Sequence, residues 1–117
     1  MLFPLAIGLT GGCYPASLGA AGATLAMDYC QTRDNASVGW KRPGVPKYGE
    51  GNPMLGVTPT PRQVDAYFVG VAVLMAAAQL MPQKYATAAN WIVAGAETVV
   101  VVNNVLVSPG ACGMYPL

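Results

Sequence analysis

Three long apolar runs and one polar stretch dominate the pattern of this chain. Residues 1–27 carry no charged side chain, residues 64–81 carry only Asp65 at their entrance, and residues 86–107 carry only Glu97. An α-helix needs roughly 20 apolar residues to cross about 30 Å of hydrocarbon. The pattern therefore predicts an all-α integral membrane protein in one domain, with about three transmembrane helices over residues 5–29, 64–82 and 86–107.

The polar stretch, residues 30–63, separates the first two runs. It holds most of the charged residues and many of the prolines and glycines, which interrupt helices and strands. It is predicted to be an irregular loop, and residues 108–117 a short tail. Only residues 81–85 separate the last two runs, which predicts antiparallel neighbours. Pro15 predicts a kink in the first run, or its division into a re-entrant piece and a span.

Composition agrees with a membrane environment. Charged residues make up 9% of the 117 residues and hydrophobic residues 54%, whereas about a quarter of an average soluble domain is charged. The formal net charge is +1, without the basic excess of a nucleic-acid-binding protein. The lipid bilayer is the expected surrounding, and nucleic acid is not an expected partner.

Charge distribution predicts an orientation. The segment from Cys30 to Gln63 carries five basic and two acidic residues. Because basic residues are enriched in cytoplasmic loops, this loop is placed in the cytoplasm of a multi-pass protein of the bacterial inner membrane. Cys30 and Cys112 would then share the cytoplasmic side, where a disulfide is not expected.

The first run carries small residues at four-residue spacing. Gly8, Gly12, Ala16 and Ala20 follow this spacing, and small residues allow a close approach of helices in lipid. This packing face is interpreted either as a contact with the other two helices of the chain or as a face for self-association or docking of another membrane subunit.

Polar residues repeat every seven positions in the last run, at Asn90, Glu97 and Asn104, which places them on one helix face. An antiparallel hairpin brings Gln79 near Asn90 and Asp65 near Asn104, and leaves Glu97 opposite the small residues around Ala72 and Ala76. A carboxylate inside a membrane is costly and often functional. Two roles stay open: structural hydrogen bonding between helices, or proton or ion transport centred on Glu97.

Catalytic and metal-binding patterns are not recognisable. The chain has no histidine, and Cys13, Cys30 and Cys112 lack the spacing of metal ligands. Enzymatic activity is therefore not expected, and the sequence assigns no cofactor. Residues Thr10 to Cys13 have the form of a lipoprotein cleavage box, but no basic residue precedes the apolar run, which favours an uncleaved first helix.

A short motif precedes the second run. Glu50, Asn52, Pro53 and Gly56 lie within Glu-Gly-Asn-Pro-Met-Leu-Gly, which Pro59 follows. This motif loop, of the form E-x-N-P-x-L-G-x-x-P ahead of an apolar hairpin, resembles uncharacterised small membrane proteins of phages and bacteria. The resemblance continues to Glu97 and Asn104 and implies no settled activity.

These observations predict a structural or accessory subunit of a larger membrane assembly. The alternatives are a phage-type membrane-active protein, holin-like or delivered into the envelope, and a small proton or ion carrier. The valine-rich segment 98–107 also allows a strand, as part of a non-membrane assembly.

Overall fold

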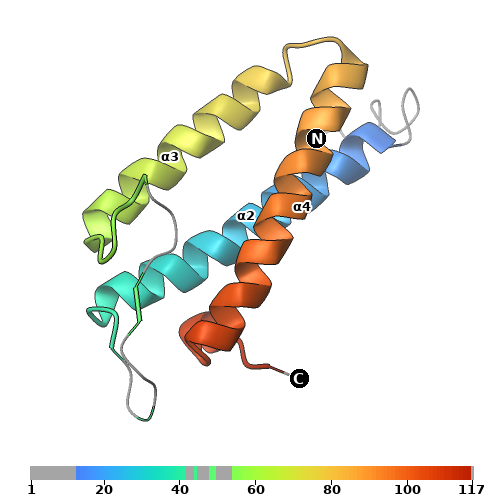
Figure 1. The fold of residues 1–117 in the computed structure, drawn as a ribbon. Helices are drawn as coiled ribbons and strands as arrows, with labels where there is room; N and C mark the ends of the chain where they lie inside the picture. Colours follow the sequence, from blue (N-terminus) through green and yellow to red (C-terminus); the bar gives the residue numbers. More distant parts are fainter. Residues whose placement is uncertain (1–12, 42–43, 45–47, 50–53, 117) are drawn as a thin grey trace.

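The computed structural model describes residues 13–41, 44, 48–49 and 54–116. It contains three α-helices, α2 (Cys13–Ser37), α3 (Pro61–Ala78) and α4 (Gln83–Val107), and a short 3₁₀ helix, η1 (Ala111–Gly113) (Figure 1). Within this part of the chain no strand forms, which confirms the all-α prediction. The valine-rich segment 98–107, the alternative strand, is the last part of α4.

α2 extends well beyond its predicted end. The loop was predicted to begin at Cys30, but the helix continues to Ser37. Gln31, Thr32 and Asn35 are at most 2% exposed, and they make hydrogen bonds within the fold. The loop prediction was wrong for residues 30–37, because the polar side chains of Gln31, Thr32 and Asn35 belong to a buried helix face. Pro15 lies in the first turn of the helix, where a missing N–H breaks no helical hydrogen bond.

Gly39 and Trp40 end α2. Both have positive φ, 69° and 60°, and the Trp40 N–H donates to the Asn35 carbonyl at 2.9 Å. A reversal through the left-handed region is a common helix end, and glycine adopts it without a steric penalty. The indole of Trp40 then turns back into the fold and donates from Nε1 to the Pro59 carbonyl at 3.0 Å.

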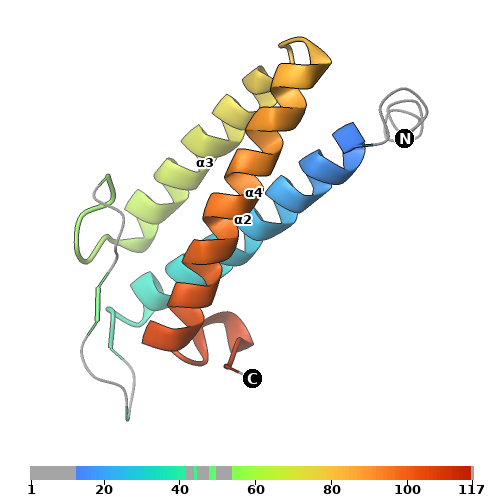
Figure 2. The same cartoon turned by 45° about the vertical axis from the view of Figure 1, so that its right-hand side comes forward.

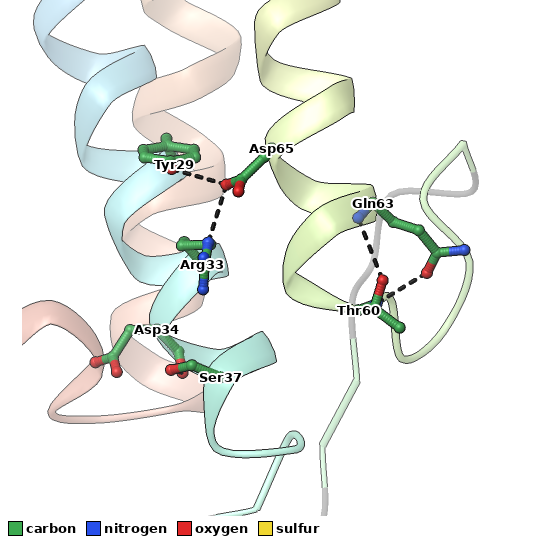
Figure 3. Close-up of polar contacts among 7 residues, drawn as sticks. All are labelled: Tyr29, Arg33, Asp34, Ser37, Thr60, Gln63 and Asp65. Atoms are coloured by element: carbon green, nitrogen blue, oxygen red, sulfur yellow. Dashed lines mark hydrogen bonds and ion pairs between the residues drawn. The ribbon is translucent and has the colours of Figure 1, made fainter.

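α3 begins with a capping box (Figure 3). The Thr60 hydroxyl accepts from the Gln63 N–H at 3.2 Å, and the Gln63 side chain accepts from the Thr60 N–H at 2.8 Å. Pro61 occupies the first helical position, where its fixed φ suits the helix. These residues start the helix three residues before the predicted position 64, and it ends at Ala78 instead of 82. α4 likewise starts before its predicted first residue, Ala86, directly after Pro82.

α2 and α4 run parallel, with α3 antiparallel to both. Ser17 contacts Asn90 at one end of the pair, and Asn35 contacts Ser108 at the other. In Figure 2 both ribbons run from the upper right to the lower left. α3 meets α4 at the short turn between them and diverges from it below that turn (Figure 1). The bundle thus has a turn end, near Gln79, and a loop end, near Ser108.

A group of buried apolar residues lies toward the loop end. Leu25 and Ala36 of α2 pack there with Val64 and Phe68 of α3 and with Trp40 and Tyr48 of the loop. The Trp40 and Tyr48 rings meet edge to face, with centroids 5.9 Å apart, a favourable geometry for aromatic pairs. This core fixes the loop against α2 and α3.

The C-terminal tail is attached to α2 by a disulfide between Cys30 and Cys112, whose Cα atoms are 5.7 Å apart. The expectation that these two cysteines form no disulfide was wrong. Sequence pattern gave no sign of it, since 82 positions separate the two residues. The tail meets α2 because the parallel arrangement brings the end of α4 beside the last turns of α2.

Among the described residues, α4 is the helix that is long and apolar enough to cross a membrane. Of the most apolar 18-residue stretch of α4, only 17% is buried within the protein. Its 25 residues span roughly 37 Å at 1.5 Å per residue, more than the hydrocarbon thickness.

Candidate functional site

The turn end is held by a cluster of three polar side chains. Gln79 and Asn90 exchange two hydrogen bonds: Gln79 Nε2 donates to Asn90 Oδ1 at 2.8 Å, and Asn90 Nδ2 donates to Gln79 Oε1 at 3.1 Å. Asn90 Nδ2 also donates to the Ser17 hydroxyl at 3.2 Å. The predicted proximity of Gln79 and Asn90 is therefore present, and the cluster joins all three helices.

A second cluster lies nearer the loop end, around Asn104. Its Nδ2 donates to Asp28 Oδ1 at 3.0 Å and to Gln31 Oε1 at 3.1 Å. The Thr32 hydroxyl donates to the same Asp28 oxygen at 2.9 Å, and Gln31 Nε2 donates to the Val101 carbonyl at 3.3 Å. These bonds compensate the removal of the Asp28 carboxyl from water, since that side chain is only 7% exposed.

Asn35 extends this cluster toward the loop and the tail. Its Nδ2 donates to the Ser108 hydroxyl at 2.9 Å, and its Oδ1 accepts from the Tyr48 hydroxyl at 2.9 Å. Both Asn35 and Ser108 are nearly inaccessible, at 2% and 1% exposed. One amide thereby connects α2, the end of α4 and the loop.

The antiparallel hairpin was predicted to bring Asp65 near Asn104. In the structure Asp65 instead contacts α2. It lies one turn into α3 and faces α2, where its Oδ1 accepts from the Tyr29 hydroxyl at 2.8 Å and from Arg33 Nε at 2.9 Å (Figure 3). The hydrogen bond from Tyr29, together with Arg33, lowers the pKa of Asp65 below its ordinary value, although partial desolvation opposes this. Its side chain is 42% exposed, which makes the ion pair a weak contributor to stability.

A cavity of about 470 Å³ lies at the loop end, where the three helices meet the loop. Its polar wall comes from α2 and α4 and includes Asp28, Glu97, Asn103 and Asn104. Its aromatic wall comes from the loop and α3 and consists of Trp40, Tyr48, Tyr67 and Phe68. The cavity thus combines two carboxyl groups, side-chain amides and four aromatic rings.

Glu97 is partly buried and lines this cavity. The small residues expected opposite it, Ala72 and Ala76, are exposed. Carboxylates, amide oxygens and aromatic faces attract cations and hydrogen-bond donors. The lining therefore suits a positively charged or donor-rich group better than an anion.

Metal coordination has no basis in the residues described: among them no group of three or more histidine, cysteine, aspartate and glutamate side chains could hold a metal ion.

Comparison with protein-family models, curated protein sequences and solved structures found no match to this chain.

Some residues singled out from the sequence do not take part in these contacts. Ala16 is exposed and Ala20 partly exposed, so the buried face of α2 lies one position further on, at Ser17 and Ala21. Gly56 is exposed with a φ of 83°, a value that glycine accommodates readily. The remaining members of the packing face and of the motif loop lie outside the described residues: Gly8, Gly12, Glu50, Asn52 and Pro53.

The sequence reasoning missed the polar face of α2. Its members alternate at spacings of four and three, which is the periodicity of one helix face. They are Ser17, Ala21, Thr24, Asp28, Gln31 and Asn35. This signal is visible in the sequence, but the predicted helix end at residue 29 divided it in two.

Proposed function

We propose that this chain is a small integral membrane protein that serves as a structural or accessory subunit of a larger membrane assembly. The observation that carries the proposal is the inverted distribution of polarity. The largest fully buried side chains are polar, with the exception of Val64: they are Gln31, Asn90, Thr32, Ser17 and Ser108. Large apolar side chains are exposed along α3 and α4, at Val69, Val73, Leu74, Trp91, Ile92, Val99, Val102 and Leu106.

Between α2 and α4 and on the outer surface of α3 and α4, this distribution is the reverse of that in a water-soluble bundle, where apolar faces are buried and polar faces are exposed. In lipid it is favourable, because the outer side chains meet acyl chains and the inner ones satisfy each other by hydrogen bonds. The spanning helix would be α4, whereas the part of α3 after Asp65 and the described part of α2 before Asp28 are each shorter than the roughly 20 residues that a span needs. They would cross the membrane only together with the apolar residues that adjoin them in the sequence. Asp65, Arg33 and Tyr29 would then lie at the membrane boundary.

Exposed glycines support docking to another membrane helix. A Cβ atom placed at Gly22 of α2, Gly70 of α3 or Gly95 of α4 would meet nothing within 4 Å. Each glycine therefore leaves open space on an outer surface, and small residues at such places allow helices to approach closely in lipid. The partners proposed are other membrane subunits or further copies of this chain, in the bacterial inner membrane.

A test of the subunit role is gentle purification of the native protein from its membrane, followed by identification of the polypeptides bound at fixed stoichiometry. We expect the chain to elute in a complex and Gly95→Leu to weaken that complex. The adjacent change Ala96→Leu, also at an exposed site of α4, is the matched control. Elution of the wild-type chain as a lone monomer would refute the subunit role.

The cavity favours a second candidate, a small proton or ion carrier in which Asp28 and Glu97 line the path. Its test is ion or proton flux into vesicles containing the purified protein, with Glu97→Gln as the variant. Flux that disappears in Glu97→Gln while the complex stays intact would favour the carrier.

The motif resemblance supports a third candidate, a phage-type membrane-active protein. Expression of such a protein should abruptly abolish the membrane potential of the cell.

A further inference from the structure

The Cys30–Cys112 disulfide is surrounded by further contacts between α2 and the tail. The Cys112 N–H donates to the Asp34 carboxylate at 2.6 Å, and Gln31 Nε2 approaches the Met114 sulfur at 3.3 Å. Ala111, next to Cys112, is only 1% exposed. Contacts on both sides of the sulfur pair therefore hold the tail against α2 and bring the two cysteines together.

All of this lies at the loop end of the bundle. Cys30 is in the second half of α2, and Cys112 follows the end of α4. The α3–α4 turn, beside Gln79 and Asn90, lies at the opposite end, and so does Cys13, the first residue of α2. A protein disulfide persists in oxidising compartments such as the bacterial periplasm and is rare in the cytoplasm, where thiols are kept reduced.

We propose that the loop end of the bundle, with the disulfide and the cavity, faces an oxidising extracytoplasmic compartment, and that the α3–α4 turn faces the cytoplasm. This orientation is opposite to the one that the loop charges predict, and it rests on the proposed insertion into a membrane. It implies that whatever enters the cavity comes from the extracytoplasmic side.

Formation of the bond requires an electron acceptor from the same compartment. A disulfide-donating protein exchanges with the two thiols: one thiolate attacks the donor's sulfur, and the second thiolate then attacks the mixed disulfide. The Cys30–Cys112 bond forms, the donor's disulfide breaks, and the two electrons and two protons lost by the thiols end on the donor's two sulfurs. Cys112 follows α4 in the chain, and its neighbour Ala111 is buried once the tail has docked on α2. The thiol–disulfide exchange therefore takes place before or during docking of the tail, while the donor protein can still reach Cys112.

The basic residues of the loop weigh against this orientation. Lys41 and Arg62 lie at the loop end, as does Arg33 of the ion pair with Asp65, whereas Lys84 lies at the turn end. Arg42 and Lys47 belong to the same polar stretch of the sequence but lie outside the described residues. The charge rule describes a bias during insertion and is not absolute. The disulfide instead depends on the compartment that the folded protein occupies, and it therefore sets the proposed orientation.

The redox state is tested by trapping thiols in cells quenched with acid. A maleimide carrying a polyethylene glycol chain adds a mass tag to each free thiol, before or after reduction. We expect Cys13→Ser to take no tag before reduction and two tags after it. Two tags on Cys13→Ser without reduction would overturn the proposal.

The orientation is tested with single reporter cysteines in the Cys13→Ser background. Thr58→Cys is at an exposed site of the loop, and Gln83→Cys is at an exposed site of the turn. A membrane-impermeant sulfonated maleimide is applied to spheroplasts and to lysed cells. We expect Thr58→Cys to react equally in both samples, and Gln83→Cys to react only after lysis.

The reverse labelling pattern would overturn the orientation and leave membrane insertion intact. Recovery of the protein in the soluble fraction, without lipid, would instead refute the proposed function. The two failures are therefore distinguished by fractionation before labelling.

Discussion

The α2–α4 interface and the outer surface of α3 and α4 have opposite chemistry. Across the interface, Ser17, Gln31 and Asn90 are at most 2% exposed and make hydrogen bonds. On the outer surface, Leu74 and Ile92 are each 71% exposed. The difference indicates that buried hydrogen bonds link α2 to α4, whereas the apolar side chains of the outer surface have no partner within the described part of the chain that covers them.

The largest effect is expected from breaking the covalent link at the end of the interface. In the chain-entropy account, closure of a loop between residues 82 positions apart stabilises the fold by about 4.5 kcal/mol. Cys112→Ser should therefore markedly lower the thermal unfolding temperature of the purified protein in detergent, measured by circular dichroism. Cys13→Ser is the control and should leave it unchanged. Equal unfolding of both variants would contradict the structure.

A charge on the outer surface should mainly affect insertion. Lysine near the centre of a membrane helix costs about 3 kcal/mol, so Ile92→Lys should reduce the inserted fraction of the chain in translation reactions containing membranes. The control Gln83→Lys places the same charge at the start of α4 and should insert normally. Normal insertion of Ile92→Lys would mean that lipid does not cover this surface.

Removal of an interface hydrogen-bonding group should have an intermediate effect. Asn90→Ala leaves Ser17 and Gln79 without this partner, which should cost about 1–2 kcal/mol of unfolding free energy. The matched change Asn103→Ala, at an exposed asparagine of the same helix, should cost much less. Denaturant unfolding in mixed detergent micelles measures both, and equal losses would show that the cluster is not a stabilising element.

The smallest effect is expected from the boundary ion pair. Asp65 has a lowered pKa in the folded state, so its contribution to stability is present above its ordinary pKa and is lost as pH falls through the folded value. Asp65→Asn should be slightly less stable than the wild type at neutral pH, and the difference should vanish in acid. A difference that grows on acidification would exclude this role for Asp65.

The apolar runs were sufficient to predict one helix for each run, though not its bounds, because length and lack of charge are local properties; residues 5–12 of the first predicted helix lie outside the described residues. The seven-residue spacing of polar residues also predicted the contact of Gln79 with Asn90. The end of α2 was missed because Gln31 and Asn35 are polar, and polarity was interpreted as exposure to solvent. Their burial depends on partners at least 70 positions away.

The pairing of Asp65 and the disulfide could not be predicted for a related reason. Both depend on how α2 lies relative to the other two helices, and the long loop between α2 and α3 allows more than one arrangement. In the structure α2 lies beside α4 in parallel, and its Tyr29 and Arg33 donate hydrogen bonds to Asp65 of α3. The cavity could not be predicted from the sequence for the same reason, because residues of all three helices and of the loop line it.

The parallel pairing of α2 and α4 sets the order of events during synthesis. The hydrogen bonds that Ser17, Asp28, Gln31 and Asn35 of α2 make with α4 and with Ser108 directly after it join residues 70 to 76 positions apart. When α2 leaves the ribosome, its partners Asn90, Val101 and Asn104 have not yet been made. The polar face of α2 therefore lacks its partners on α4 until the last helix has been made. For a chain inserted into a membrane as proposed, this face would need water or another protein as its surroundings during that interval.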